Sequence, residues 1–161
     1  MHPPTHVLGS SCSTCSNDQS CCTNVDLNPL LILPGDLESY GERNVEPWTD
    51  GTYRATPKRN GDCVHFVSGQ CNLGAKRPIM CRTYPLLYDG QRWILDAQCP
   101  AAAITMFRAA LSGSEESEFI RRAITRLRAA GPALTEPVRQ ITRRWRYVLT
   151  VDESTFPKSL R

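Results

Sequence analysis

Four of the eight cysteines in this 161-residue chain lie within the segment CSTCSNDQSCC, residues 12–22. The last two are adjacent, and the residues around them are almost all polar. Across residues 1–24 the large aliphatic side chains are Val7 and Leu8. This is too little apolar surface to offset an ordering cost of about 1–2 kcal/mol per residue. The segment is therefore either disordered or held together by bonds to a ligand.

Thiolates are soft, strongly donating ligands, and a Cys-x2-Cys pair followed by further cysteines is typical of zinc and iron–sulfur sites. Cys12 and Cys15 have this spacing, so that one tight turn can direct both sulfurs at one ion. Adjacent side chains diverge, so Cys21 and Cys22 either serve two neighbouring metals or divide into a ligand and a supporting thiol. The predicted metal ligands are all eight cysteines: Cys12, Cys15, Cys21, Cys22, Cys63, Cys71, Cys81 and Cys99.

The number of metal ions stays open at this point. Eight thiolates allow two four-sulfur sites, one site with spare cysteines, or a multinuclear centre with bridging sulfurs. A disulfide framework and a few buried structural thiols are the alternatives. The start of the chain, MHPPTHVLGSSC, lacks the basic region and apolar run of a secretory signal, which favours a reducing compartment and metal over disulfides. The predicted cofactor is zinc or iron, the iron alone or in an iron–sulfur cluster.

Net charge and hydropathy limit the kinds of partner that are expected for this chain. The net charge of +3 is well below that of a dedicated nucleic-acid-binding protein, so nucleic acid is not an expected partner. No stretch approaches the ~20 apolar residues that span a bilayer. We expect a cytoplasmic protein that binds metal ions and has no membrane partner; a protein partner is not indicated.

Short hairpins are expected between the later cysteines. CVHFV at 63–67 alternates, which predicts a strand with Cys63 and His65 on one face, and Ser68-Gly69 can turn it back toward Cys71. LLYDGQRWIL at 86–95 predicts a second hairpin around Asp89-Gly90.

The region before these hairpins contains weaker signals. Asp36 can cap a short helix that ends at Gly41. Residues 42–62 are rich in turn formers and are expected to be loop, with one short strand near Tyr53. Asp96, close to Cys99, is expected to be a turn or surface residue.

The last third of the chain has no cysteine and has helical patterning. Pro100 suits the first position of a helix over 101–113, and Ser112 with Glu115 fits a capping box for a helix that ends at Gly131. A last helix is expected to carry Val138, Ile141, Trp145 and Val148 on one stripe. Together these helices predict a helical hairpin packed over the cysteine-rich part.

The helical part is rich in arginine, and a solvated face is the ordinary interpretation of such a surface. The alternative is an interaction surface for RNA or an acidic protein, with Trp145 and Tyr147 interleaved. Its residues are Arg121, Arg122, Arg126, Arg128, Arg139, Arg143, Arg144 and Arg146.

CSTCSNDQSCC, CVHFVSGQCNLGAKRPIMCRTYP and DAQCP, taken as an ordered set over residues 12–100, resemble the YkgJ family of CxxCxxCC-type cysteine-cluster proteins. The Arg-Pro-x-x-Cys-Arg-x-Tyr/Phe-Pro signature of that family is matched by Arg77, Pro78, Cys81, Arg82, Tyr84 and Pro85. Five residues separate Cys15 from Cys21, where a shorter, glycine-containing gap is usual. The resemblance implies zinc or iron chelation in a bacterial cytosolic protein whose biochemical role is mostly unassigned.

The signature also has a physical interpretation. Pro78 can start a short helix that carries Cys81, and Tyr84-Pro85 can end it. Arg77 and Arg82 could donate charge-assisted hydrogen bonds to the sulfurs, although surface positions are the alternative. His65, beside Cys63, is a third candidate for a supporting role or for ligation.

The predicted fold is α+β: a small, metal-centred, cysteine-rich and irregular domain with short hairpins and a C-terminal helical segment. Residues 1–161 are expected to form a single domain, with a cysteine-cluster part at 12–100 and a helical part at 101–150. The predicted function is binding of zinc or an iron–sulfur centre through thiolates. Two alternatives remain: a metal-dependent enzyme related to cysteine-cluster N-methylases, and a zinc-scaffolded interaction module that uses the arginine-rich helices.

Overall fold

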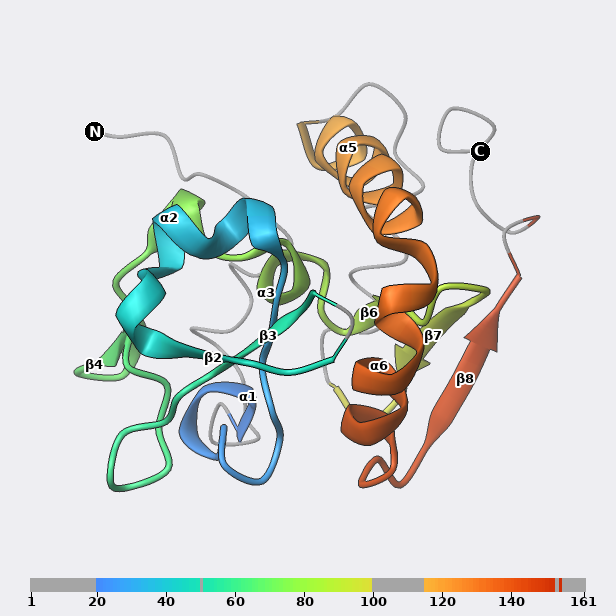
Figure 1. Ribbon diagram of the computed structural model, residues 1–161. Helices are drawn as coiled ribbons and strands as arrows, with labels where there is room; N and C mark the ends of the chain where they lie inside the picture. Colours follow the sequence, from blue (N-terminus) through green and yellow to red (C-terminus); the bar gives the residue numbers. More distant parts are fainter. Residues whose placement is uncertain (1–19, 50, 100–114, 153, 155–161) are drawn as a thin grey trace.

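The computed structural model describes residues 20–49, 51–99, 115–152 and 154, with only the backbone described for residues 20, 21 and 115–120. The short elements α1 to β5 lie on one side, and α5, α6 and the strands β6 to β8 lie on the other (Figure 1). Each side has its own apolar cluster. No helix within the described residues is long and apolar enough to cross a bilayer.

The first side is built around a small antiparallel sheet, in the order β1-β3-β2. Its strands are β1 (Leu31–Ile32), β2 (Val45–Pro47) and β3 (Tyr53–Ala55), and the helical segments beside them are α1 (Ser20–Thr23), η2 (Pro34–Asp36), α2 (Leu37–Tyr40) and η3 (Glu42–Asn44). Val25, Ile32, Tyr40, Ala55 and Cys63 form its buried cluster. A thiol therefore belongs to the core of this side.

The prediction of a strand near Tyr53 is confirmed, but β2 was missed in a region expected to be loop. Polar and proline residues give β2 no alternation that a sequence pattern could reveal. It forms because both Val45 and Glu46 pair with β3. The short helix ended by Gly41 is also confirmed, with Gly41 in the left-handed region at φ 97°.

Both predicted hairpins are present. β4 (Phe66–Val67) pairs with β5 (Gln70–Cys71), and the turn residues Ser68 and Gly69 both have positive φ. The strand is shorter than predicted, because Cys63 and His65 lie in the turn before β4. The idea that they share a strand face is therefore wrong.

The second hairpin joins β6 (Leu86–Tyr88) to β7 (Trp93–Asp96). Its connection spans residues 89–92, with Asp89 Oδ1 accepting the backbone N–H groups of Gln91 and Arg92. The carboxylate thus closes a longer loop than the two-residue turn that Asp89-Gly90 suggested. β6 and β7 are buried along their whole length.

Helix α3 (Ile79–Thr83) follows η4 (Gly74–Lys76) and begins after Pro78, as predicted. Asp36 does not cap its own helix. Its Oδ2 instead accepts the backbone N–H of Ile79 at 3.0 Å, and its Oδ1 accepts a hydrogen bond from Arg126 at 3.0 Å. One buried carboxylate therefore joins η2 to the start of α3 and to the helix that contains Arg126.

On the second side, α5 (Glu115–Ala130), η5 (Gly131–Leu134) and α6 (Thr135–Thr142) follow one another and do not fold back as a hairpin (Figure 1). Ala123, Ile124 and Leu127 of α5 are buried in the same apolar cluster as the β6–β7 hairpin. The predicted helix 101–113 and the Ser112 cap lie outside the described residues.

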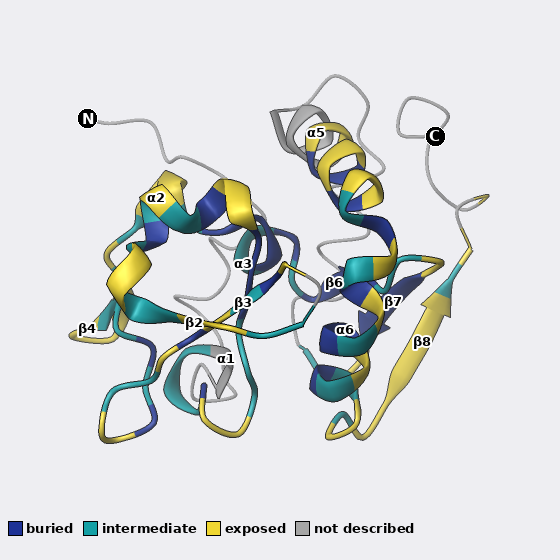
Figure 2. Cartoon of the chain, viewed as in Figure 1, coloured by how far each residue is buried: buried dark blue, intermediate teal, exposed yellow. Residues whose placement is uncertain are grey.

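The last helix is shorter than predicted, and a strand follows it. Val138 and Ile141 are buried on α6, but α6 ends at Thr142, and Trp145 and Val148 lie beyond it. Val148 opens β8 (Val148–Val151), which pairs antiparallel with β7. The strand is exposed along most of its length (Figure 2). The expectation that residues 101–150 are helical is therefore wrong at 148–150.

The predicted α+β class agrees with this mixture of small sheets and helices. Residues distant in the sequence meet in it, since β8 from the C-terminal part completes the sheet of the hairpin that precedes Cys99. This arrangement leaves a cavity between the two sides of the molecule.

Candidate functional site

A cavity of about 510 Å³ lies between the two apolar clusters. Four thiols from four different segments line it: Cys22 of α1, Cys63 before β4, Cys71 of β5 and Cys81 of α3. The remaining wall is largely apolar and includes Leu31, Met80 and Leu87. The fold thus brings together four of the predicted metal ligands.

Backbone hydrogen bonds hold α1 against this cavity. The N–H of Cys63 donates to the carbonyl of Cys22 at 2.7 Å, and the N–H of Val25 donates to the carbonyl of Gly61 at 2.8 Å. Gly61 has φ 85°, and a Cβ there would lie 2.7 Å from Oδ1 of Asp26. Glycine therefore lets the loop before Cys63 approach the chain that follows Cys22.

The environment of the thiols opposes their ionisation. Burial raises the pKa of Cys81 well above its ordinary value, and the neighbouring Cys22, Cys63 and Cys71 raise it further. Burial also raises the pKa of Cys71, and the nearby Cys22 and Cys63 act in the same direction. The four sulfurs are thus close enough to influence one another, and a bound cation would offset the charge of their thiolates.

Cys63, Cys71 and Cys81 are free thiols. Among the described residues, however, no three His, Cys, Asp or Glu side chains form a ready group for one metal ion. The four thiols share a cavity without converging on a single point. With zinc–sulfur bonds of about 2.3 Å, binding one ion would require these side chains to move inward.

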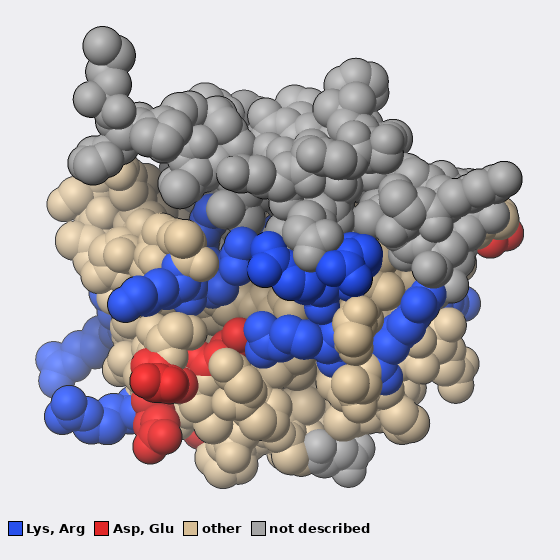
Figure 3. Space-filling model, turned by 90° about the horizontal axis from the view of Figure 1, so that it is seen from above, with Lys and Arg blue, Asp and Glu red and all other residues tan. Residues whose placement is uncertain are grey.

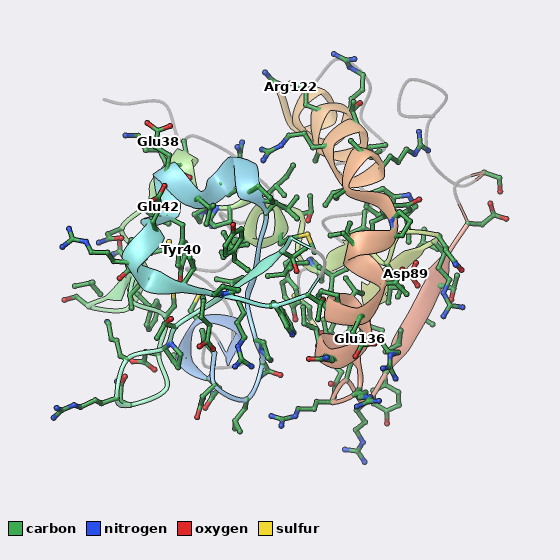
Figure 4. All side chains as sticks on the ribbon, in the orientation of Figure 1. Glu38, Tyr40, Glu42, Asp89, Arg122 and Glu136 are labelled. Atoms are coloured by element: carbon green, nitrogen blue, oxygen red, sulfur yellow. The ribbon has the colours of Figure 1, made fainter. Side chains whose placement is uncertain are left out.

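Tyr40 is a supporting residue that the sequence patterns did not indicate. It projects inward from α2, whereas Glu38 on the same helix projects outward (Figure 4). Its hydroxyl lies 3.4 Å from Sγ of Cys63. Burial, followed by the hydrogen bond with Cys63, raises the pKa of Tyr40, so the hydroxyl keeps its proton; either the hydroxyl or the thiol can be the donor in this hydrogen bond.

His65 supports Tyr40. Nε2 of His65 donates to the carbonyl of Tyr40 at 2.6 Å, and Nδ1 lies 3.1 Å from Oδ1 of Asn72. The two rings also meet edge to face, with 4.6 Å between centroids. Since both ring nitrogens have partners, this arrangement favours the supporting role considered for His65 over metal ligation.

The two signature arginines lie differently. Arg77 lines the cavity, and its charge lowers the pKa of Cys71 and Cys81 against the larger effect of burial. Arg82 is not among the residues that line the cavity, and it faces Asp36, Arg122 and Arg126. Arg77 can therefore moderate thiolate charge, whereas Arg82 belongs to the surface around Asp36.

The structure does not describe the whole predicted ligand set. Cys12 and Cys15 lie outside the described residues, and for Cys21 only the backbone is described. Cys99 is partly exposed at the turn after β7 and is not among the described residues that line the cavity. Ligation by these four cysteines stays a prediction.

The burial of Asp96 in the cavity wall was not predicted from the sequence. Asp96, expected in a turn or at the surface, ends β7 and is only 5% exposed. It lines the cavity together with Tyr84, which follows α3, and Trp145, which follows α6. The continuous apolar run before it could have indicated this burial, because Asp96 ends a strand whose residues are all buried.

Of the arginines in the signature and in the helical part, Arg77 and Arg144 line the cavity and the others do not. Lys and Arg side chains gather across the face seen in Figure 3. Arg77, Arg122 and Arg126 all act on the Arg82 guanidinium, whose pKa is lowered mainly by burial. We call these four residues the arginine cluster. Asp36 offsets part of its charge through the ion pair with Arg126.

No family model matches this chain, and no curated protein and no solved structure does so either.

Proposed function

We propose that this protein binds zinc or iron, the iron alone or in an iron–sulfur centre, through cysteine thiolates. The observation that carries the proposal is the cavity lined by Cys22, Cys63, Cys71 and Cys81. Four independent segments deliver a thiol to it, whereas one sequence cluster alone could place cysteines together by chance. The motif resemblance to the YkgJ family supports the same interpretation.

The donor set fits such a group. Thiolates suit zinc and iron–sulfur clusters, and a bound cation would stabilise sulfurs that burial otherwise keeps protonated. A zinc ion would cross-link the segments, and an iron–sulfur centre would add electron transfer. The residues proposed to hold the group are the four that line the cavity, joined by Cys12, Cys15, Cys21 and Cys99 to complete one or two sites.

The test is elemental analysis of protein purified without oxygen, counting zinc, iron and acid-labile sulfide per chain. We expect metal near whole-number stoichiometry in the unaltered protein and a loss of at least half in Cys81→Ser. Thr83→Ser, also on α3 but not among the residues that line the cavity, is the matched control and should keep the metal. Unaltered protein that contains no zinc or iron after oxygen-free purification, or equal metal in both variants, would contradict the proposal.

The arginine cluster favours a second candidate, an interaction module folded by its metal. Arg77, Arg122 and Arg126 act electrostatically on Arg82, and Asp36 is the carboxylate paired with the cluster, so the net positive charge suits an acidic partner. Charge reversal at Arg122, which Figure 4 shows projecting from α5, should reduce capture of such a partner, with Arg59→Glu on a distant loop as control. Unchanged capture by the Arg122 variant would exclude this role for the cluster.

A further inference from the structure

Asp96 places a negative charge in the wall of the cavity that the thiols also line. One carboxylate oxygen accepts a hydrogen bond from the hydroxyl of Tyr84, and the other accepts the backbone N–H of Gln98 at 3.0 Å. Among the described residues, no Lys, Arg or His forms an ion pair with Asp96. Asp96 is nonetheless buried, with only 5% of the residue exposed.

A buried carboxylate without a cation is costly, because two hydrogen bonds replace only part of its hydration. An ionised carboxylate can accept roughly four hydrogen bonds, so Asp96 retains capacity for a further donor. Since the carboxylate borders a cavity, a bound ligand can supply that donor. The group that fits best is one that brings both positive charge and N–H bonds.

The walls beside Asp96 suit an organic cation. The rings of Tyr84 and Trp145 lie 6.0 Å apart at a steep angle, and both border the cavity. Aromatic faces attract ammonium groups, most strongly where water is excluded. Leu87 and Ile141 add apolar surface for the body of a ligand. A volume of about 510 Å³ also exceeds what a metal ion needs and is typical of small-molecule pockets.

The arginines that line the cavity do not favour an anionic ligand at this end. Arg144 is exposed, and it donates to the carbonyl of Leu27. Arg77 donates from Nε to the carbonyl of Gly74 and lies beside the thiols. Among the described residues that line the cavity, the charge that lacks both solvent and a counter-ion is therefore the carboxylate of Asp96.

We propose that the Asp96 end of the cavity binds the protonated amine of a small organic molecule, with Tyr84 and Trp145 flanking the cationic group. The apolar body of the ligand lies along Leu87 and Ile141. The amine site uses the carboxylate of Asp96 and the metal site uses the thiols, so the two are separate functions of one cavity. The inference stands on Asp96 and does not require the metal.

The experiment compares three probes with the same aromatic body and different head groups: phenethylammonium, 2-phenylethanol and phenylacetate. Binding to the intact, metal-loaded chain is followed by calorimetric or NMR titration at neutral pH. We expect saturable binding of the ammonium probe at least tenfold tighter than that of the alcohol, and weaker binding still of phenylacetate. Asp96→Asn keeps the shape and the Tyr84 contact, and should weaken the ammonium probe at least tenfold, about 1.4 kcal/mol.

Asp62→Asn, a carboxylate outside the cavity, is the control and should leave all three affinities unchanged. Metal content is measured in the same samples, so a missing metal and a missing amine site are separate results. Tighter binding of phenylacetate to the unaltered chain would overturn the proposal without any variant. Equal ammonium affinity in Asp96→Asn and the unaltered chain, or no saturable ammonium binding, would overturn it too.

Discussion

The hydroxyl of Tyr40 lies 3.4 Å from the sulfur of Cys63, and the carbonyl of Tyr40 accepts a hydrogen bond from His65. Tyr40 thereby joins α2 to the turn that carries Cys63. Both Tyr40 and Cys63 are buried, so this contact is part of the core and of the cavity wall at once. Stability and the position of one thiol are coupled at this point.

Replacing Tyr40 with phenylalanine should lower the free energy of unfolding by about 1 kcal/mol, because the ring stays but the hydrogen bond to sulfur is lost. Chemical denaturation measures the change. Tyr53→Phe, which removes a hydroxyl on β3 outside the cavity, is the control and should change stability by much less. Equal effects of the two substitutions would show that the Tyr40 hydroxyl contributes nothing through Cys63.

Asp36→Ala should destabilise the protein by about 2–3 kcal/mol, because it leaves the buried N–H of Ile79 and the Arg126 guanidinium without their acceptor. Arg126→Ala should cost about 1 kcal/mol or less, since the arginine side chain is 44% exposed and water can replace it. Denaturant titration of both variants shows which substitution lowers the free energy of unfolding more. A larger loss for Arg126→Ala would mean that the ion pair, and not the bond to α3, is the main contribution of Asp36.

Gly90→Ala should cost more than about 2 kcal/mol, because φ is 96° and a Cβ would lie 2.5 Å from the carbonyl oxygen of Gly131. Gly51→Ala has a similar φ of 75° but meets nothing within 4 Å, so it reports backbone strain alone. Thermal unfolding of the two variants separates the cost of the steric clash from the cost of backbone strain. Matching losses would show that the β6–β7 loop does not depend on close contact with η5.

The metal-free protein should become less stable as pH rises above 9.0, the ordinary pKa of a cysteine thiol. The pKa values of Cys71 and Cys81 are raised in the folded state, so the unfolded chain loses its thiol protons first. The stabilisation is thus complete below pH 9.0 and is lost on the way to the higher folded-state values. Denaturation of chelator-treated protein across this range measures the slope, which Cys81→Ser should reduce. A stability that does not change with pH in this range would contradict the raised pKa values of Cys71 and Cys81.

Much of the local structure followed from sequence patterns. Pro78 predicted the start of α3, Gly41 and Gly131 predicted helix ends, and Ser68-Gly69 predicted the first hairpin turn. These signals depend on backbone conformations that few residues adopt.

The errors have one physical source, which is pairing between distant segments. β2 and β8 are short or exposed strands without alternation, and they exist because β3 and β7 offer them free edges. The helical pattern of apolar residues continues to Val148 in the sequence. In the structure, pairing with β7 stabilises a strand there instead. Asp36 looked like a local cap and acts on α3 instead, because Ile79 reaches it from another segment.

The sequence by itself determined the chemistry of this protein: eight thiols, four of them in a polar segment that cannot bury itself, and turn residues that set the short elements. Tertiary structure decided which thiols share a cavity, that Tyr40 contacts Cys63 and is held by His65, and that Asp96 is buried in the wall of the same cavity. The reason is that residue type fixes what a side chain can bind. Only long-range packing fixes which side chains meet and how much water reaches them.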